Sequence, residues 1–303
     1  MNTLAHGLSF ADLEFQGLPR IIATAVAQGR DGLAIIDPGP SSTLPVLRRH
    51  LAALGASVGD ITTLLITHIH LDHAGATGTL LRENPRIRVV VHEVGAPHMV
   101  DPSRLLASAG RLYGADMERL WGAVQPVPAS SITTVVGGEG LTVGGRPWLV
   151  AYTPGHASHH VSYFSPESGI AFVGDTGGVQ VRPGGFVLPP TPPPDIDLAQ
   201  WTASLTRIAA WHPQSLFMTH FGPTHAVDAH LAELQDHLQL VERLARQALV
   251  TSEEEPAREA WFVAEVRREL ARRMGEADLR AYDVAGRFDL NWRGMVRFLT
   301  RRR

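Results

Sequence analysis

The sequence contains no cysteine and no lysine. Without cysteine there are no disulfides, no thiol nucleophile and no thiolate metal ligands, although this absence does not by itself fix the cellular compartment. All 27 basic residues are therefore arginine, which we attribute to coding bias because alanine, glycine and proline are abundant. The net charge of −3 argues against a general nucleic-acid binder.

Long apolar runs are also missing. Residues 1–20 lack the basic start and apolar stretch of a secretory signal, and no segment approaches the length of a membrane-spanning helix. We therefore expect a cytoplasmic protein with no membrane partner. With 303 residues and 44% hydrophobic content, the chain can bury a large core as one domain plus an extension.

The most informative segment places three histidines and an aspartate within six residues. His68, His70, Asp72 and His73 directly follow the apolar run 61–66, which is typical of a buried strand. Imidazole and carboxylate ligands together suit zinc, iron or manganese, and the lack of thiolate argues against a purely structural zinc site. The segment therefore predicts a metal centre at the end of a strand.

Three further strand-like segments end in the same kind of side chain, next to a glycine that permits a tight turn. Open sheets bind ligands beyond the ends of their strands, so these ends can converge on one edge. The segments are residues 148–153 before His156, residues 170–173 before Asp175, and residues 216–218 before His220.

The order His-x-His-x-Asp-His, followed by separated His, Asp and His, resembles the metallo-β-lactamase-fold hydrolases over about residues 20–225. The resemblance implies an α/β fold, an αββα four-layer sandwich of two mixed β-sheets packed face to face. It implies a catalytic domain over residues 1–226 and a helical extension over 227–303. It also implies two divalent metal ions: one held by His68, His70 and His156, one by Asp72, His73 and His220, with Asp175 between them.

Two divalent ions that share a water molecule can lower its pKa to about 7, which provides hydroxide at neutral pH. Asp175 offsets the mutual repulsion of the ions, and Asp72 adds a second negative ligand. We therefore expect these two carboxylates to be the catalytic residues. Zinc is the metal that we expect, and iron and manganese are the alternatives. We expect Asp72 and His73 both to lie at a solvent-accessible edge. The reaction expected is hydrolysis of a small ester, lactone or thioester.

Other proteins of the same fold suggest alternative functions for this chain. A mononuclear iron enzyme of the persulfide dioxygenase type would use His68, His156 and Asp175 as a facial triad. A phosphodiesterase or nuclease of the same fold, or a non-catalytic scaffold, is also considered. His73 favours the glyoxalase II-like and lactonase-like groups. Glutathione thioesters are not preferred, because no Gly-Cys-Gly-Arg-type segment follows Asp175 and no glutathione-gripping basic residues can be matched.

Three surrounding features add further expectations. His160 is expected to hydrogen-bond a metal ligand. The proline-rich residues 181–197 form either a connector to a helix capped by Asp197 or a substrate-facing wall that uses Phe186 and Leu188. A helical stretch over 102–120 should be interrupted near Gly110 and Gly114.

From residue 227 onward helical patterns dominate, with a break near residues 253–256. Apolar residues spaced for burial predict that the extension docks, either over the metal edge to shape a pocket, or to complete the core, or in a homodimer contact. The expected partner is a small-molecule substrate. The apolar residues are Trp261, Phe262, Val266, Leu270, Phe288, Leu290, Trp292, Met295, Val296 and Phe298.

Overall fold

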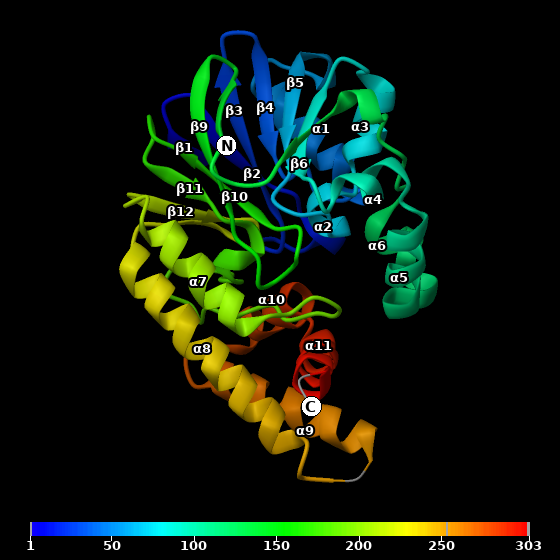
Figure 1. Cartoon of the computed structure of the whole chain (residues 1–303), viewed down its shortest axis with the longest axis vertical. Helices are drawn as coiled ribbons and strands as arrows, with labels where there is room; N and C mark the ends of the chain where they lie inside the picture. Colours follow the sequence, from blue (N-terminus) through cyan, green and yellow to red (C-terminus); the bar gives the residue numbers. More distant parts are fainter. Residues whose placement is uncertain (1, 253, 302–303) are drawn as a thin grey trace.

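A computed structural model of the chain describes residues 2–252 and 254–301. Two mixed β-sheets pack face to face and helices cover their outer faces (Figure 1). The predicted α/β class and αββα sandwich are therefore confirmed, as is the C-terminal helical region.

Among the described residues, the first sheet has seven strands in the order β1-β2-β3-β4-β5-β6-β7. The first three strand pairs are antiparallel and the last three are parallel, so the carboxyl ends of β4, β5 and β6 meet at one edge. The strands are β1 (Asn2–Ala5), β2 (Leu8–Asp12), β3 (Ala23–Gly29), β4 (Gly32–Ile36), β5 (Ile61–Leu65), β6 (Arg88–His92) and β7 (Ile132–Val135).

The second sheet has six strands within the same described ranges, in the order β13-β12-β11-β10-β9-β8. Only the pair β11 and β12 is parallel there, which aligns the carboxyl ends of these two strands. The strands are β8 (Gly140–Val143), β9 (Arg146–Tyr152), β10 (Val161–Ser165), β11 (Ile170–Phe172), β12 (Ser215–Met218) and β13 (Gly222–Thr224).

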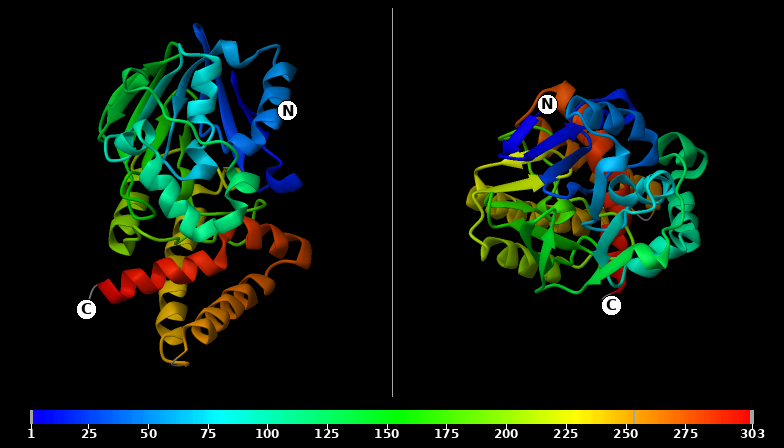
Figure 2. Two further views of the ribbon diagram at one scale, coloured as in Figure 1. Left: turned by 90° about the vertical axis from the view of Figure 1, so that its right-hand side faces the viewer. Right: turned by 90° about the horizontal axis from the view of Figure 1, so that it is seen from above.

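Helices flank the sheets and continue beyond them at the C-terminal end of the chain (Figures 1 and 2). The predicted interruption at Gly114 is present, but the one at Gly110 is wrong: the helix runs through Gly110, because a single glycine within a helix costs only about 1 kcal/mol relative to alanine. The helices are α1 (Leu44–Ala53), α2 (Leu71–Ala74), α3 (Thr77–Glu83), α4 (Ala96–Val100), α5 (Ser103–Tyr113), α6 (Met117–Trp121), α7 (Leu198–Ala209), α8 (Val227–Ala248), α9 (Glu255–Ala271), α10 (Glu276–Gly286) and α11 (Phe288–Arg301).

Aromatic side chains join the two sheets. Phe10 of β2 meets Phe217 of β12 edge to face, with ring centroids 5.6 Å apart, and Trp148 and Tyr163 are fully buried in the same cluster. Such pairs add about 0.5–1.5 kcal/mol beyond area burial. Strand β2 thus belongs to the core and β1 pairs with it, although the motif-based resemblance began only near residue 20.

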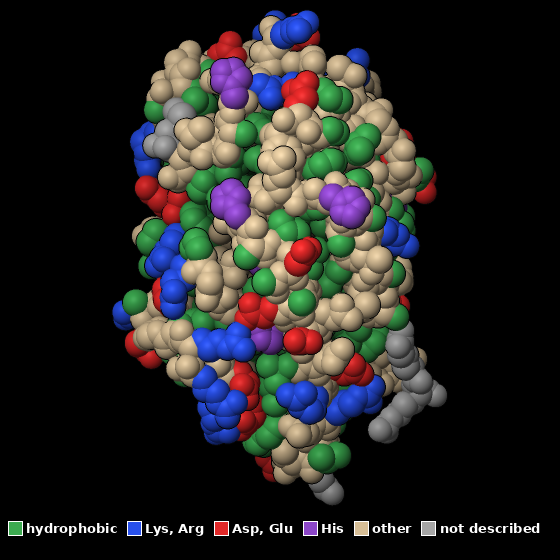
Figure 3. Space-filling view, turned by 90° about the vertical axis from the view of Figure 1, so that its left-hand side faces the viewer, with side chains coloured by type: hydrophobic (Ala, Val, Ile, Leu, Met, Phe, Trp, Pro, Cys, Tyr) green, Lys and Arg blue, Asp and Glu red, His purple; other side chains and the backbone are tan. Residues whose placement is uncertain are grey.

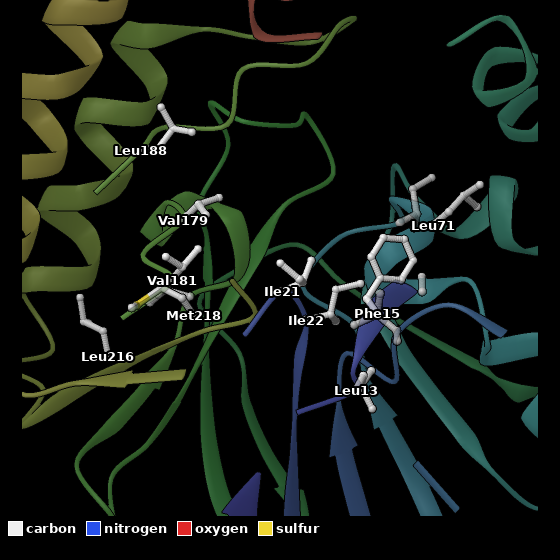
Figure 4. Close-up of a cluster of buried hydrophobic side chains, with 14 of the residues drawn as sticks. Leu13, Phe15, Ile21, Ile22, Leu71, Val179, Val181, Leu188, Leu216 and Met218 are labelled. Atoms are coloured by element: carbon white, nitrogen blue, oxygen red, sulfur yellow. The ribbon is translucent and has the colours of Figure 1, made fainter. Parts of the chain in front are cut away.

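A second buried cluster lies beneath the converging strand ends. Figure 4 shows Ile21 and Ile22 between Phe15 and Leu71 on one side and the β12 end, including Met218, on the other. Leu71 sits within the predicted metal-binding segment, and its apolar side chain anchors that segment in the core. Burial of each such side chain stabilises the fold by about 1.5–3 kcal/mol.

The C-terminal helices dock against this cluster, as the sequence predicted. Phe262, Trp292 and Met295 are fully buried, and α11 packs on both α8 and α9. The predicted break falls between the end of α8 at Ala248 and the start of α9 at Glu255, while Glu253 itself lies outside the described residues.

The surface carries charges of both signs. On the face shown in Figure 3, arginine and acidic side chains intermingle in the lower part of the molecule. Pairs such as Arg246 with Glu242 and Arg272 with Glu269 follow helical spacing on α8 and α9. Within the described residues, no helix is both long enough and apolar enough to cross a membrane.

Candidate metal centre

Four strand ends converge on one edge of the sandwich. His68 and its neighbours follow β5, His156 follows β9, Asp175 follows β11 and His220 follows β12. Within each of two groups, the potential ligand atoms all lie within 4.8 Å of one another. The structure brings together every residue that the sequence motif predicted. The groups are His68, His70, His156 and Asp175, and Asp72, His73 and His220.

In the first group, three imidazole nitrogens face a common point. His70 Nδ1 lies 3.0 Å from Nε2 of His68 and 3.0 Å from Nε2 of His156. Asp175 Oδ2 lies 3.3 Å from His156 Nε2. A tetrahedral ion with bonds of about 2.0–2.1 Å requires ligand separations of roughly 3.3 Å. The group therefore has the dimensions of a metal site with three nitrogens and one oxygen.

The second group shares Asp175 with the first. His73 Nε2 and His220 Nε2 lie 3.1 Å and 3.6 Å from Asp175 Oδ1, the oxygen that does not face His156. Asp72 Oδ2 completes this group at 3.3 Å from His220 Nε2. One carboxylate thus presents one oxygen to each group, the arrangement that a ligand common to two ions requires.

The outer nitrogens determine where the lone pairs point. Nδ1 of His156 donates to the carbonyl oxygen of Pro190 at 2.8 Å, and Nδ1 of His220 donates to that of Ile21 at 2.6 Å. His73 Nδ1 donates to Asp37 Oδ2 at 2.8 Å. A carbonyl or carboxylate oxygen can only accept, so each Nδ1 holds a proton and Nε2 is the nitrogen left to bind a cation in the site.

Two buried atoms at the centre lack ordinary partners. His73 Nε2 and Asp175 Oδ1 lie 3.1 Å apart, and neither atom has any other hydrogen-bond partner among the described residues. When the imidazole is neutral, both atoms present lone pairs, and a buried polar atom without a partner costs about 1–3 kcal/mol. A divalent cation between a nitrogen lone pair and a carboxylate oxygen would satisfy both atoms. The donor set fits such an ion.

The pKa values follow the same division into two groups. Burial lowers the pKa of His70 to about 4 and the pKa of His68 well below its usual value, with neighbouring imidazoles adding to the effect. Both rings are therefore neutral near pH 7, as a metal ligand must be.

The second group has the opposite balance. Burial lowers the pKa of His73, but the carboxylates of Asp175, Asp37 and Asp72 outweigh it and raise that pKa well above its ordinary value. Burial likewise raises the pKa of Asp72, but His73 and His220 outweigh it and lower that pKa to about 2. The carboxylates thus stabilise positive charge in this group, and a bound divalent cation would provide that charge.

Asp37 is a site residue that the sequence motif does not include. Its side chain is fully buried and accepts hydrogen bonds from His73 Nδ1, from Thr67 N and Oγ1 at 2.8 and 2.7 Å, and from Thr219 Oγ1 at 2.9 Å. Asp37 thus links the residues at the ends of β5 and β12 to His73 through hydrogen bonds. The usable signal was an aspartate directly after β4, at the same edge of the sheet.

Two expectations about the segment around the motif need correction. His73 is fully buried, whereas the Asp72 side chain is 25% exposed, so only Asp72 lies at an accessible edge. Successive residues of a helix point about 100° apart, and α2 turns His73 inward toward Asp37. His160 hydrogen-bonds Thr153 Oγ1 at 2.9 Å and not a predicted ligand; its ring instead stacks on His68, with centroids 5.0 Å apart.

A cavity of about 290 Å³ opens beside the two groups and reaches His70, Asp72, Asp175 and His220. Much of its remaining wall comes from three regions: the α5–α6 segment, the proline-rich loop and the junction of α10 with α11. The residues from these three regions include Leu105, Ala109, Leu112, Tyr113, Trp121, Pro190, Pro192, Arg287 and Leu290. Val94, His98, Ser158 and His159 also line the cavity.

Prolines, and not the two residues suggested by the sequence, form the wall of the 181–197 segment. Phe186 and Leu188 are buried away from the cavity; the Phe186 ring stacks on His237 at 3.7 Å. These apolar side chains gain more by packing under α8 and α10 than by facing solvent. The connector role also holds, because Asp197 accepts hydrogen bonds from Ala199 N and Gln200 N and caps α7.

An αββα sandwich with a histidine and aspartate cluster at one edge defines a class of metal-binding proteins. The model of the metallo-beta-lactamase superfamily matches residues 18–220, and this chain belongs to that superfamily. Most members are metal-dependent hydrolases. The resemblance inferred from the motif is thereby confirmed.

Individual relatives share only a modest sequence identity with this chain. A metallo-beta-lactamase fold-containing protein of Sulfurisphaera tokodaii is 27% identical over 221 residues, which cover 72% of this chain and 78% of that protein. Hydroxyacylglutathione hydrolase of a Synechococcus species is 31% identical over 143 residues, covering 47% of this chain but only 43% of that enzyme.

A solved structure extends the similarity to the C-terminal helices. The metallo-beta-lactamase family protein of Thermus thermophilus superposes with a TM-score of 0.72, covering 99% of this chain and 95% of that one at 23% identity. At this identity the likeness shows a common fold, helical extension included, and says nothing about the substrate.

Proposed function

We propose that this protein is a metal-dependent hydrolase that holds two divalent cations and cleaves a small ester, lactone or thioester. The observation that carries the proposal is the position of Asp175, whose two oxygens face separate groups of imidazole nitrogens. The second group gives a second cation its own set of ligands. Zinc suits the nitrogen and oxygen donors, and iron or manganese would also be accepted.

The proposed division of ligands follows the two groups. His68, His70 and His156 would hold one cation, Asp72, His73 and His220 the other, and Asp175 would contact both. Two such cations, when bound, would lower the pKa of a shared water and polarise a carbonyl oxygen. The chain's own contribution is orientation: Pro190, Ile21 and Asp37 hold the outer Nδ1 protons, so that the lone pairs point inward.

The cavity supports a small and partly apolar substrate. Leu105, Ala109, Leu112 and Trp121 form one wall, and Leu290 faces it from α11. A volume of about 290 Å³ is at the lower end of small-molecule sites, which span roughly 300–1,000 Å³. Such a space suits an acyl group with a short hydrocarbon part better than a polymer, so no nucleic-acid or membrane partner is proposed.

We also propose that residues 1–226 form the catalytic domain and that residues 227–303 act as an extension that completes the pocket. All the proposed metal ligands precede residue 227. The extension supplies Gly286, Arg287 and Leu290 to the cavity wall.

A hydrolysis panel with defined metals tests the proposal. Zinc-, iron- and manganese-loaded protein would be assayed on esters, lactones, thioesters, a phosphodiester and a β-lactam, beside an Asp175→Asn variant. We expect two ions per chain, turnover in the first three substrate classes, and loss of turnover in the variant. One iron per chain with oxygen-dependent turnover of a persulfide would refute the proposal, as would preferred cleavage of the phosphodiester.

A further inference from the structure

One tyrosine stands apart from the others on the wall of the cavity. Tyr113, the last residue of α5, lines the same space as Asp72 and Asp175. The hydroxyls of Tyr152, Tyr163 and Tyr282 all donate to backbone carbonyl oxygens. The Tyr113 hydroxyl has no hydrogen-bond partner among the described residues. It is also not fully buried, since the buried polar atoms that lack a partner do not include it. It is therefore free to meet a molecule in the cavity.

The ring of Tyr113 is held from two sides. Trp121 meets it edge to face with centroids 4.9 Å apart, and the Arg287 guanidinium lies 5.2 Å from its centroid. Arg287 is fixed in turn by both oxygens of Asp289, at 3.1 and 2.9 Å. The phenol is thus pre-oriented, and its position depends on a residue of the C-terminal extension.

The electrostatic surroundings determine what this hydroxyl can do. Burial raises the pKa of Tyr113 above its ordinary value. The hydroxyl therefore keeps its proton and is a poor acid, which suits a hydrogen-bond donor better than a group that gives its proton away.

We propose that Tyr113 is a catalytic residue that donates a hydrogen bond to the substrate carbonyl oxygen as that oxygen becomes negatively charged. The inference rests on the proposed hydrolase function. In the reaction, water adds to the carbonyl carbon, the bond to the leaving oxygen or sulfur breaks, and the products are a carboxylic acid and an alcohol or thiol. Tyr113 retains its proton throughout. Donors placed where charge develops stabilise the transition state more than the ground state.

The test compares Tyr113→Phe with Tyr152→Phe in zinc-loaded protein. In Tyr113→Phe the substituted ring can keep its contacts with Trp121 and Arg287, so only the hydroxyl is lost. Tyr152 lies outside the cavity wall and donates to Ser158 O at 2.9 Å, which makes it a matched control. We expect Tyr113→Phe to lower kcat by about 10- to 100-fold, somewhat less than for a sole oxyanion donor because the cations share the charge. KM and metal content should stay near the wild-type values, and Tyr152→Phe should retain full activity.

Two leaving groups separate this role from proton donation. A p-nitrophenyl ester needs no proton on its leaving oxygen, whereas an ethyl ester does. The inference predicts the same fold loss for both esters in Tyr113→Phe. A loss confined to the ethyl ester would overturn the assignment, because it would mean that Tyr113 protonates the leaving group. Wild-type kcat in the variant on both esters would also overturn it.

Binding of butylphosphonate gives a readout that does not require turnover. Its tetrahedral phosphorus carries oxygens in place of the hydrated carbonyl, and calorimetry should show binding at least tenfold weaker in Tyr113→Phe than in Tyr152→Phe. Equal binding, or none in either protein, would overturn the inference even if esters are hydrolysed. If no substrate class is hydrolysed, the proposed function fails on its own, and the phosphonate comparison still decides the role of Tyr113.

Discussion

Asp37 offers the sharpest perturbation of the candidate metal centre without touching a proposed ligand. Its Oδ2 atom accepts from His73 Nδ1, Thr67 Oγ1 and Thr219 Oγ1, and its Oδ1 atom accepts from Thr67 N. Asparagine has the same shape but only one acceptor oxygen. In Asp37→Asn, an amide group must therefore face either the Thr67 N–H or the cluster of three donors.

The two orientations have different costs. If the amide faces Thr67 N, one buried donor loses its partner, which costs about 1–3 kcal/mol. If the amide faces His73, that ring can accept from it only by moving its own proton from Nδ1 to Nε2. The proton would then point at Asp175, and the nitrogen could no longer bind a cation. Loss of an outer partner of a ligating histidine lowers metal affinity by about 10- to 100-fold.

Zinc titration by calorimetry, together with thermal unfolding of the metal-free protein, measures both effects. We expect wild-type protein to bind two ions, and Asp37→Asn to keep one tight site while the second weakens. Asp60→Asn is the control, because Asp60 accepts from Ser57 N and Oγ on the surface, away from the cluster. Two sites of wild-type affinity in Asp37→Asn would refute the reasoning about the His73 lone pair.

Two further substitutions test the ligand assignment and the docking of the extension. Asp72→Ala should abolish hydrolysis while the fold and the first ion persist, since its side chain is partly exposed; full turnover with one ion bound would contradict a two-ion mechanism. Gly294→Ala should destabilise the protein by about 1–3 kcal/mol, because a Cβ there would overlap the carbonyl oxygen of Thr191 and push α11 off the proline-rich loop. Gly110→Ala, in open space on α5, should instead stabilise by about 1 kcal/mol, and equal unfolding temperatures for these two glycine variants would argue against tight docking of α11.

The strand ends and their polar residues could be predicted because the signals are local. An apolar run followed by a turn and a histidine or aspartate identifies a strand end without knowledge of its neighbours. The motif then supplied the partners of His68 and His73 from distant parts of the chain. The antiparallel hairpin of β3 and β4 is another local feature, because its two strands are adjacent in the chain.

Features that depend on long-range packing were not predictable in the same way. Asp37 and His73 are 36 residues apart, and only the parallel pairing of β4 with β5 brings them into contact. Tyr113 and Arg287 meet because α5 and the α10–α11 junction close over one cavity. Phe186 was misassigned because an apolar residue in a loop can face either a substrate or the underside of a helix. Sequence pattern alone does not decide between the two.

Anomalous diffraction from crystals of the zinc-loaded protein would show whether two cations share Asp175. We expect two peaks at the zinc edge roughly 3.5 Å apart. One should lie among His68, His70 and His156, the other among Asp72, His73 and His220, with one Asp175 oxygen toward each. A single peak within the first group, or two peaks without Asp175 between them, would contradict the account.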